Sequence, residues 1–419
     1  ETKPEFIKQY FSFQPVNIIQ QTQYRLGLLA ACCLSCMPTA DLAAKEPLKV
    51  YILAGQSNMV GLAHVDTMDV IGLDPKTAPM LEDMRNADGT HKVLDDVWIS
   101  SIRSSGEEKI GKLSVGYGAE NRGLRIGPEF TFGIYMQKHV KEPILIIKTA
   151  WGGKSLSKNF RPPSAGALPF HELQAEALKK KGEDVEAARA KHAEDTGHYY
   201  RLMTEHVHHV LGDIKRVYPD YDPKQGYELA GFVWFQGWND LVDSQTYPNS
   251  SKPGSFDAYS EVLAHFIRDV RKEFSAPNLP FVIGVLGVNG PVSTYHGKRY
   301  IARDTQFRNA MAAPASMPEF KGNVLAVRTE DYWDQKLGAL LVKKYGIHAE
   351  IKRKVREGEI KGNGKKEREL MIAEAFTQEE LDFMKAGTSS AGYHYHGSAK
   401  ILGQIGKAFA DAAWKMHQK

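Results

Sequence analysis

The fold is indicated first by the stretch Val50-Tyr51-Ile52-Leu53-Ala54-Gly55-Gln56-Ser57-Asn58-Met59-Val60-Gly61. A continuous run of apolar, strand-forming residues ends there in Gly-Gln-Ser-Asn. Such a run is typical of a buried parallel strand, and the group that follows it lies at the carboxyl edge of an α/β sheet. We therefore predict that Ser57 is a nucleophile. The same residues are also typical of a plain strand-to-helix turn capped by Ser or Asn, so the prediction depends on partners elsewhere in the chain.

Four more apolar runs predict buried strands, over residues 143–150, 229–236, 280–287 and 323–327. Helical patterns separate them, such as the segment opened by Pro128 and the one that carries Tyr259 to Val270 at helical spacing. This alternation predicts an α/β fold with one doubly wound, parallel, five-stranded sheet. A charged helical insertion at 171–216 and a basic insertion after the fifth strand are expected to lie outside the sheet.

Composition excludes several classes of function. The chain has 419 residues, of which 42% are hydrophobic and 25% charged, as expected for a soluble protein with a large core. Its formal charge of +4 is small for this length, so it indicates neither nucleic-acid nor membrane-surface binding. The densest basic run, Lys352-Arg353-Lys354-Val355-Arg356, is interrupted downstream by glutamates and has no aromatic residues for base stacking, which favours a solvated surface.

All three cysteines lie near the start of the chain, at positions 32, 33 and 36. They follow Arg25 and a short apolar core, and small residues come after them. This pattern predicts that residues 1–45 are a leader with a signal-peptide-like segment cleaved near Ala43 or Ala44, and that the protein is secreted or periplasmic. A lipoprotein-like box before Cys32 offers a lipid anchor as an alternative, and a buried amphipathic helix is another. Residues 46–419 are predicted to form one catalytic domain.

Four pieces of sequence stand at predicted strand ends or just before the last helix. They are Gly55-Gln56-Ser57, Gly152-Gly153, Gly237-Trp238-Asn239-Asp240, and the pair His394 and His396. In an open α/β sheet these ends converge on one crevice. Together they supply the groups that acyl transfer requires: a serine nucleophile, a histidine base and N–H donors for the oxyanion. The backbone N–H groups of Ser57, Gly152 or Gly153 and the side-chain amide of Asn239 are the candidate donors.

In this order, the blocks resemble those of the SGNH (GDSL-type) hydrolases. Over about residues 46–416, the chain is similar to the sialate O-acetylesterase and carbohydrate esterase family 6 acetyl xylan esterase group. The similarity lies in three motifs: Gly-Gln-Ser-Asn-Met, Thr-Ala-Trp-Gly-Gly-Lys-Ser and the His-Tyr-x-Gly-Ser-Ala-Lys ending. The resemblance implies a flavodoxin-like sheet, no cofactor or metal, and an acetylated carbohydrate as substrate. It also implies that Ser57 is the nucleophile, that Gly152, Gly153 and Asn239 complete the oxyanion hole, and that His394 is the base.

The acid of the triad is missing from its usual place. Members of the group usually carry Asp three residues before the catalytic histidine, and here that position is Ala391. Asp334 is the first candidate replacement, with Asp331 and Asp240 as others; a Ser–His dyad assisted by a backbone carbonyl is a further possibility.

The base itself has two candidates. Matching the His-Tyr-x-Gly-Ser-Ala-Lys block favours His394, whereas counting back from the final helix favours His396 as the alternative base.

Four residues are candidates for contacting the substrate. They are Gln56, Trp151, Trp238 and Glu129, where Trp151 and Trp238 offer stacking platforms for a sugar, as does Trp333. Each tryptophan is also typical of a plug at the end of a core. Glu129 is equally a candidate for supporting the nucleophile loop or for a helix first-turn acid, and Gln56 for shaping the turn.

The sequence thus predicts a serine esterase that hydrolyses O-acetyl esters on carbohydrates. Two alternatives stay open. One is an esterase for a non-carbohydrate acyl substrate. The other is a non-catalytic carbohydrate-binding relative, which is supported by the absence of an aspartate at position 391.

Overall fold

The computed structural model describes residues 46–120, 123–294 and 297–418. The predicted leader, including Cys32, falls in residues 1–45 and therefore lies outside the described residues. Signal cleavage, the lipid anchor and the secreted or periplasmic location stay predictions. Contacts group Lys45–Lys419 into one compact unit.

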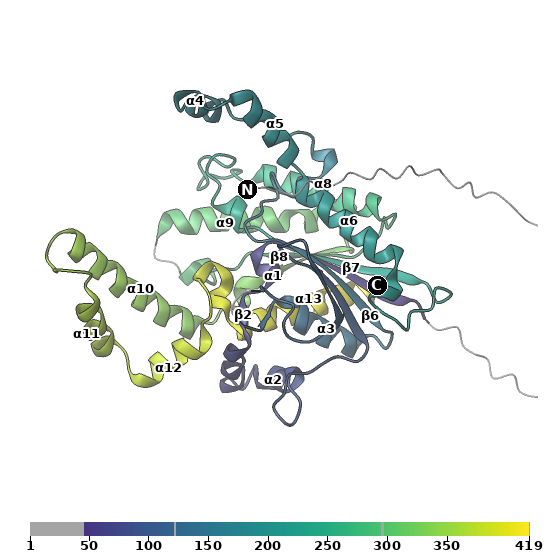
Figure 1. Ribbon diagram of the computed structural model, residues 1–419, viewed down its shortest axis with the longest axis horizontal. Coiled ribbons are helices and arrows are strands. Elements are labelled where there is room, and N and C mark those ends of the chain that lie inside the picture. Colours follow the sequence, from purple (N-terminus) through teal and green to yellow (C-terminus); the bar gives the residue numbers. More distant parts are fainter. Residues whose placement is uncertain (1–45, 121–122, 295–296, 419) are drawn as a thin grey trace, which may run out of the picture. The chain divides into compact units, whose positions relative to one another are not determined.

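Within the described residues, seven strands form one sheet in the order β4-β3-β6-β1-β7-β8-β9. Figure 1 shows this sheet, with β6, β7 and β8 labelled. Their bounds are β1 Leu48–Gly55, β3 Val97–Ile102, β4 Glu108–Lys112, β6 Ile144–Ala150, β7 Tyr227–Phe235, β8 Phe281–Val285 and β9 Val324–Arg328. Every neighbouring pair is parallel except β3 with β4. The predicted α/β fold is confirmed: the five expected strands are β1, β6, β7, β8 and β9, and counted along the chain they have the flavodoxin order 2-1-3-4-5.

The sheet extends two strands beyond the prediction. β3 adds in parallel to β6, and β4 folds back on β3 as an antiparallel edge. Both strands carry polar side chains, Ser100 and Ser101 in β3 and charged residues in β4, so neither reads as a continuous apolar run. Charged side chains on an edge strand also protect it from pairing with another chain.

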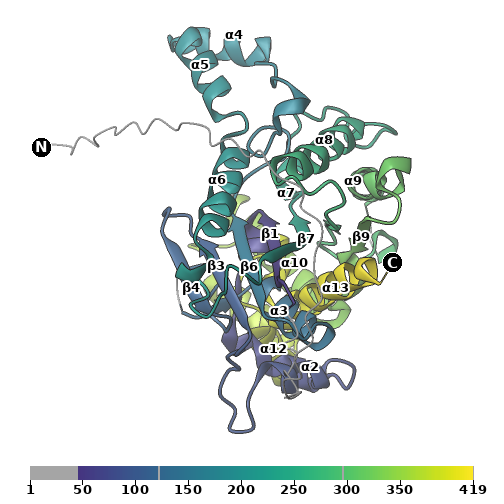
Figure 2. The same ribbon diagram turned by 90° about the vertical axis from the view of Figure 1, so that its right-hand side faces the viewer.

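Helices cover both faces of the sheet (Figure 2). Successive residues of β7 point to opposite faces: Trp234 contacts Phe266 with ring centroids 4.5 Å apart, and Phe235 contacts Phe409 at 5.3 Å. Phe266 belongs to α8 and Phe409 to α13, so these helices lie on opposite sides of β7. The longer helices of the domain are α3 Pro128–His139, α6 His198–Gly212, α8 Asp257–Glu273, α9 Lys298–Ala312, α10 Gln335–Arg356 and α13 Ala399–His417.

Shorter elements complete the described chain. They are α1 Ser57–Val60, α2 Ala78–Met84, α4 Glu172–Lys180, α5 Val185–Asp195, α7 Trp238–Leu241, α11 Lys365–Ala375, α12 Gln378–Gly387 and the two-stranded pair β2 Ala63–His64 with β5 Arg125–Ile126. No helix among the described residues has the length and apolar character needed to cross a bilayer.

The predicted basic insertion is a group of helices, α10 to α12, with a small core of its own. Six buried side chains form that core: Leu337, Leu341, Ile347, Ile351, Phe376 and Met384. The basic run lies at the end of α10, where Lys352 and Arg353 are exposed.

A buried ion pair holds the turn that carries Ser57. Lys148 of β6 and Glu129 of α3 are almost fully buried, and their Nζ and Oε2 atoms lie 2.7 Å apart. Lys148 Nζ also donates to the backbone carbonyls of Val60 and Tyr117, each at 2.8 Å. Desolvation lowers the pKa of Lys148. Because Val60 is the last residue of α1, this ion pair ties the nucleophile turn to β6 and α3.

Replacing Lys148 by Met is expected to lower the free energy of unfolding by roughly 3–5 kcal/mol, because it leaves the Glu129 carboxylate buried and unpaired. The measurement is urea denaturation followed by circular dichroism. The matched control is Lys49→Met, which breaks the more exposed Lys49–Glu228 pair and should change stability by less than about 1 kcal/mol. Equal effects of the two substitutions would contradict this role for Lys148.

Candidate active site

Three adjacent strand ends bring the first candidate groups together. β1 pairs with β6 on one side and β7 on the other, so that Gly55 lies opposite both Ala150 and Phe235. Ser57 begins α1 after β1, Gly152 follows β6, and Asn239 lies in α7 after β7. The predicted convergence of these pieces is therefore present in the structure.

Glycine at position 55 makes this approach possible. A Cβ atom there would lie 2.2 Å from the carbonyl oxygen of Phe235, which no side chain can tolerate. At position 152, a Cβ would lie 3.9 Å from the Cβ of Ser57, so the backbone of Gly152 passes close to the candidate nucleophile. A side chain at position 55 would therefore push β1 and β7 apart, whereas a Cβ atom at position 152 would make an ordinary van der Waals contact with Ser57.

The structure brings His394 to Ser57. The Nε2 atom of His394 lies 3.1 Å from the Oγ atom of Ser57, within hydrogen-bond distance. His394 belongs to the short 3-10 segment η8, Gly392–Gly397, which directly precedes α13. Partial burial, with a smaller contribution from the positive charge of Arg125, lowers the pKa of His394 to about 4. The ring is therefore neutral at pH 7 and free to accept a proton.

The other ring nitrogen of His394 contacts a serine. Nδ1 lies 3.1 Å from the Oγ atom of Ser390. If Nε2 accepts the Ser57 proton, the neutral ring must carry its own proton on Nδ1, which then donates to Ser390. A hydroxyl thus stands where a triad has a carboxylate.

The prediction that Asp334 is the acid of the triad is wrong. One oxygen of its carboxylate accepts the backbone N–H of Leu337 at 2.9 Å and so caps α10, and the other accepts Lys400 Nζ at 2.9 Å. Its carboxylate is engaged by α10 and α13, whereas the hydrogen bond of His394 Nδ1 goes to Ser390. The ion pair with Lys400 explains its place without any catalytic role.

His396 does not reach the nucleophile. Its ring is buried, packs against Trp333 with centroids 4.8 Å apart, and has no hydrogen-bond partner among the described residues. Burial lowers its pKa to about 4. Of the two candidate bases, His394 is the one that the structure places beside Ser57.

A chain of amide side chains fixes the orientation of Asn239. The backbone N–H of Gly237 donates to Gln56 Oε1 at 3.0 Å, and because a backbone N–H can only donate, that oxygen is identified. The Gln56 Nε2 group must then be the donor, and it donates to Asn239 Oδ1 at 3.1 Å. The Nδ2 group of Asn239 is left as the free donor end of its amide. One backbone N–H thus determines which end of Asn239 can meet an oxyanion.

Asp240 anchors the other end of this chain. Its buried carboxylate accepts the backbone N–H groups of Leu156 at 2.8 Å and Ser157 at 3.0 Å, and it also accepts Gln236 Nε2 at 2.7 Å. Gln236 Nε2 in turn lies 3.1 Å from Gln56 Oε1. Burial raises the pKa of Asp240. Asp240 therefore holds the loop after β6 against α7, and its carboxylate is not the partner of His394.

Further donors lie around Ser57 Oγ. Ser57 is the first residue of α1, so its backbone N–H has no acceptor within the helix, and Gly152 and Gly153 are exposed in the loop after β6. Gly153 has a φ of +72°, a left-handed conformation that suits glycine. Together with Asn239 Nδ2, these N–H groups are the predicted oxyanion donors, and the fold leaves them available at the three strand ends.

Three of the four residues predicted to contact the substrate are engaged in contacts within the protein. Glu129 is buried in the pair with Lys148 and also accepts the N–H of Gly127 at 2.9 Å, so it supports the nucleophile turn. Gln56 is buried and uses both ends of its amide within the protein. Trp151 is 5% exposed and packs against Phe160 and Tyr199 as part of the core.

The fourth residue, Trp238, is only partly buried. Its indole stacks on Tyr393 with centroids 5.5 Å apart, and Tyr393 contacts His394 at 4.3 Å. Trp238 also lines a cavity beside the site. It stays a candidate for contacting the substrate.

The histidines of α6 have separate partners. His206 Nε2 lies 2.9 Å from Ser100 Oγ, burial lowers the pKa of His206 to about 4, and His208 Nε2 lies 2.8 Å from Glu273 Oε1. Among the described residues, no group of three or more His, Cys, Asp or Glu side chains is arranged to hold a metal ion.

Sequence reasoning missed three functional neighbours: Ser390, Gln236 and Lys148. Ser390 lies one residue before Ala391, the position expected to hold the aspartate, and a lone serine there carries no distinguishing pattern. Gln236 directly follows the apolar run of β7. A polar residue at the end of such a run was the signal that could have identified it. Lys148, a charged residue inside the apolar run of β6, was a second such signal.

Several solved structures match this chain, among them two distant likenesses. A protein from Arabidopsis thaliana matches at 14% identity and a TM-score of 0.34, over 68% of this chain and 86% of its own length. A carbohydrate acetylesterase from Xanthomonas citri matches at 14% identity and a TM-score of 0.37, over 68% of this chain and 51% of its own length, so this chain spans about half of that protein. A search of curated proteins gave no match.

A family model covers most of the domain. It is described as carbohydrate esterase, sialic acid-specific acetylesterase, and it matches residues 47–345, which include Ser57, Gly152 and Asn239 but end before His394. The resemblance that the motifs indicated is thereby confirmed, and the chain belongs to the family of sialic acid-specific acetylesterases among the carbohydrate esterases.

Proposed function

We propose that this protein is a serine esterase that removes acetyl groups from carbohydrate hydroxyls through a covalent acyl-enzyme. The observation that carries the proposal is the 3.1 Å contact between His394 Nε2 and Ser57 Oγ, beside three strand ends that offer N–H donors. Membership of a carbohydrate esterase family supports the class of substrate.

In the first half of the reaction, Ser57 Oγ attacks the acetyl carbonyl carbon while its proton passes to His394 Nε2. The negative charge on the carbonyl oxygen is stabilised by Asn239 Nδ2 and the backbone N–H groups of Ser57 and Gly152. The bond between the acetyl carbon and the sugar oxygen then breaks, and His394 returns the proton to that oxygen. The products of this half are the free sugar hydroxyl and acetyl-Ser57.

In the second half, water takes the place of the sugar hydroxyl. His394 accepts a proton from the water, the hydroxide attacks the acetyl carbon, and the same donors stabilise the oxyanion. The bond to Ser57 Oγ breaks, Oγ takes the proton back from His394, and acetate leaves. No step requires a carboxylate, and Ser390 holds the imidazole through its Nδ1 proton in both halves.

Replacing Ser57 by Ala is expected to lower kcat for 4-nitrophenyl acetate by at least about 10³-fold, because it removes the attacking hydroxyl at His394 Nε2, whereas the Ser390 hydroxyl contacts the other ring nitrogen. The spectrophotometric rate of nitrophenolate release measures it. Ser155→Ala is the matched control, since that serine lies in the loop after β6 and bonds Asn159. Undiminished activity of Ser57→Ala would refute the proposal.

The preference for the acetyl group is tested separately, by varying the length of the acyl chain of the ester. An acetylesterase should lose activity steeply from the acetyl to the butyryl ester, whereas a lipase-like enzyme would gain it.

The pH profile of kcat/KM should show a single acid limb near pH 4. His394 must be neutral to accept the Ser57 proton, and with its pKa lowered to about 4 it becomes protonated, and inactive as a base, only as the pH falls through that value. His394→Ala should remove the activity across the whole profile, whereas His396→Ala should keep the limb where it is. An unchanged rate in His394→Ala would exclude this base.

Ser390 is expected to act as a positioning residue for the base. Ser390→Ala should lower kcat by about tenfold with little change in KM, because the imidazole loses the acceptor that fixes its tautomer. Ser390→Asp supplies a carboxylate to Nδ1, which raises the pKa of His394 and so should move the acid limb to higher pH. A purely structural role for Ser390 would leave the limb in place in both variants, and that result would count against this assignment.

A further inference from the structure

A cavity of about 570 Å³ lies beside the candidate active site. Its walls come from segments that are far apart in the sequence, among them Trp238 and Val242 after β7, Tyr300 and Arg303 on α9, and Ala339 on α10. The volume falls within the range of about 300–1,000 Å³ that is typical of ligand pockets.

Trp238 joins this cavity to the reacting groups. It immediately precedes Asn239, whose amide is a candidate oxyanion donor, and its ring stacks on Tyr393, which contacts His394. It also lines the cavity. The cavity therefore lies next to the site, with Trp238 and Tyr393 between it and His394.

Several apolar side chains of the cavity walls are exposed to solvent. Tyr300 is 56% exposed, Val342 on α10 is 67% exposed and Val242 is 49% exposed, and all three line the cavity. Such clustering of exposed apolar groups is a mark of a binding surface. Flat aromatic rings, here Trp238 and Tyr300, are suited to the C–H face of a pyranose ring.

A charged group stands among these rings. Arg303 Nε donates to Asp304 Oδ1 at 2.7 Å, and its guanidinium lies 5.2 Å from the centroid of the Tyr300 ring. Both contacts hold the guanidinium in place, while its terminal N–H groups have no hydrogen-bond acceptor in the described part of the chain. These donors suit hydroxyl groups at the edge of a sugar, whereas an acyl chain would gain nothing from them.

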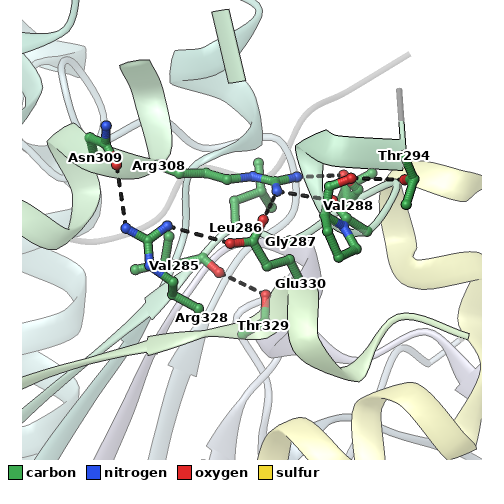
Figure 3. Close-up of polar contacts among 12 residues, drawn as sticks. Val285, Leu286, Gly287, Val288, Thr294, Arg308, Asn309, Arg328, Thr329 and Glu330 are labelled. Atoms are coloured by element: carbon green, nitrogen blue, oxygen red, sulfur yellow. Dashed lines mark hydrogen bonds and ion pairs between the residues drawn. The ribbon is translucent and has the colours of Figure 1, made fainter. Parts of the chain in front are cut away.

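A network of polar contacts around Arg308 supports one wall of the cavity; Figure 3 shows this network. Arg308 of α9 donates to the backbone carbonyls of Val288 and Gly290, each at 2.9 Å, and forms an ion pair with Glu330 after β9. These bonds hold the loop that carries Asn289, another wall residue. A wall held in this way loses little conformational freedom when a ligand binds.

We propose that the cavity is a subsite for the sugar unit adjacent to the acetylated one, so that the preferred substrate is an O-acetylated oligosaccharide and not an acetylated monosaccharide. This inference rests on the proposed function. The aromatic faces bind the C–H surface of the adjacent ring, Arg303 bonds its hydroxyls, and the acetylated unit lies at Ser57 on the other side of Trp238.

The test compares acetate release from chemically O-acetylated xylotriose, cellotriose, mannotriose and sialyllactose with release from the matching acetylated methyl glycosides. For the wild type, at least one oligosaccharide should exceed its methyl glycoside in kcat/KM by about tenfold. The ratio of the two values should then fall by about fivefold or more in Tyr300→Ala, which removes a ring, and in Ala339→Trp, which fills the cavity from an exposed position of α10.

Ala349→Trp is the matched control, because Ala349 is exposed on the same helix outside the cavity; its ratio should equal that of the wild type. A ratio near one in the wild type, or a ratio that both cavity variants leave unchanged, would overturn the subsite while leaving the esterase intact. Calorimetric binding of the unacetylated oligosaccharides, weakened in Ala339→Trp, tests the subsite without catalysis. Failure to release acetate from any substrate would count instead against the proposed function.

Discussion

The position of β1 between β6 and β7 is the constraint on which the site depends. Parallel neighbours on both sides place three carboxyl ends next to one another, and Gly55 allows β1 and β7 to approach closely at that end. Ser57, Gly152 and Asn239 follow those ends directly. The order of the strands therefore brings together groups that are separated by about 180 residues, which no local motif can do.

Neutral groups, more than charges, orient this site. Gln56, Gln236 and Asn239 form a chain in which each amide is fixed by its neighbour and finally by the N–H of Gly237 and the carboxylate of Asp240. The carboxylates near the strand ends are engaged elsewhere: Asp240 holds the loop after β6, and Asp334 caps α10 and pairs with Lys400. The base is left with a hydroxyl partner and a low pKa, which keeps it neutral through the physiological range.

Much of this arrangement was predictable because it follows from continuous apolar runs. β1, β6, β8 and most of β7 are buried, and the edge strand β9 is a short apolar run, so these five could be read from the sequence. β3 interrupts its apolar residues with Ser100 and Ser101 and could not. Ser57, Gly152 and Asn239 were found because they follow those runs.

The errors concern residues whose role is set by partners far away in the sequence. Asp334 was misassigned because its ion pair with Lys400 joins the start of α10 to α13, far along the chain. For Glu129, a supporting role and a substrate contact were both candidates, because Lys148 reaches it only when β6 meets α3. Trp151 and Trp238 occupy similar places after their strands, yet one is enclosed by Phe160 and Tyr199 and the other borders a cavity. Only tertiary packing distinguishes them.

The central claim is that Ser57 Oγ forms a covalent bond to the acyl group. It is tested most directly by mixing the wild-type protein with 4-nitrophenyl acetate, quenching with acid within the first turnover, and mapping the modified peptide by mass spectrometry. The account predicts one acetyl group, located on Ser57 and lost again on longer incubation. An acetyl group on another residue, or acetate release with no acetylated protein at any time point, would contradict it.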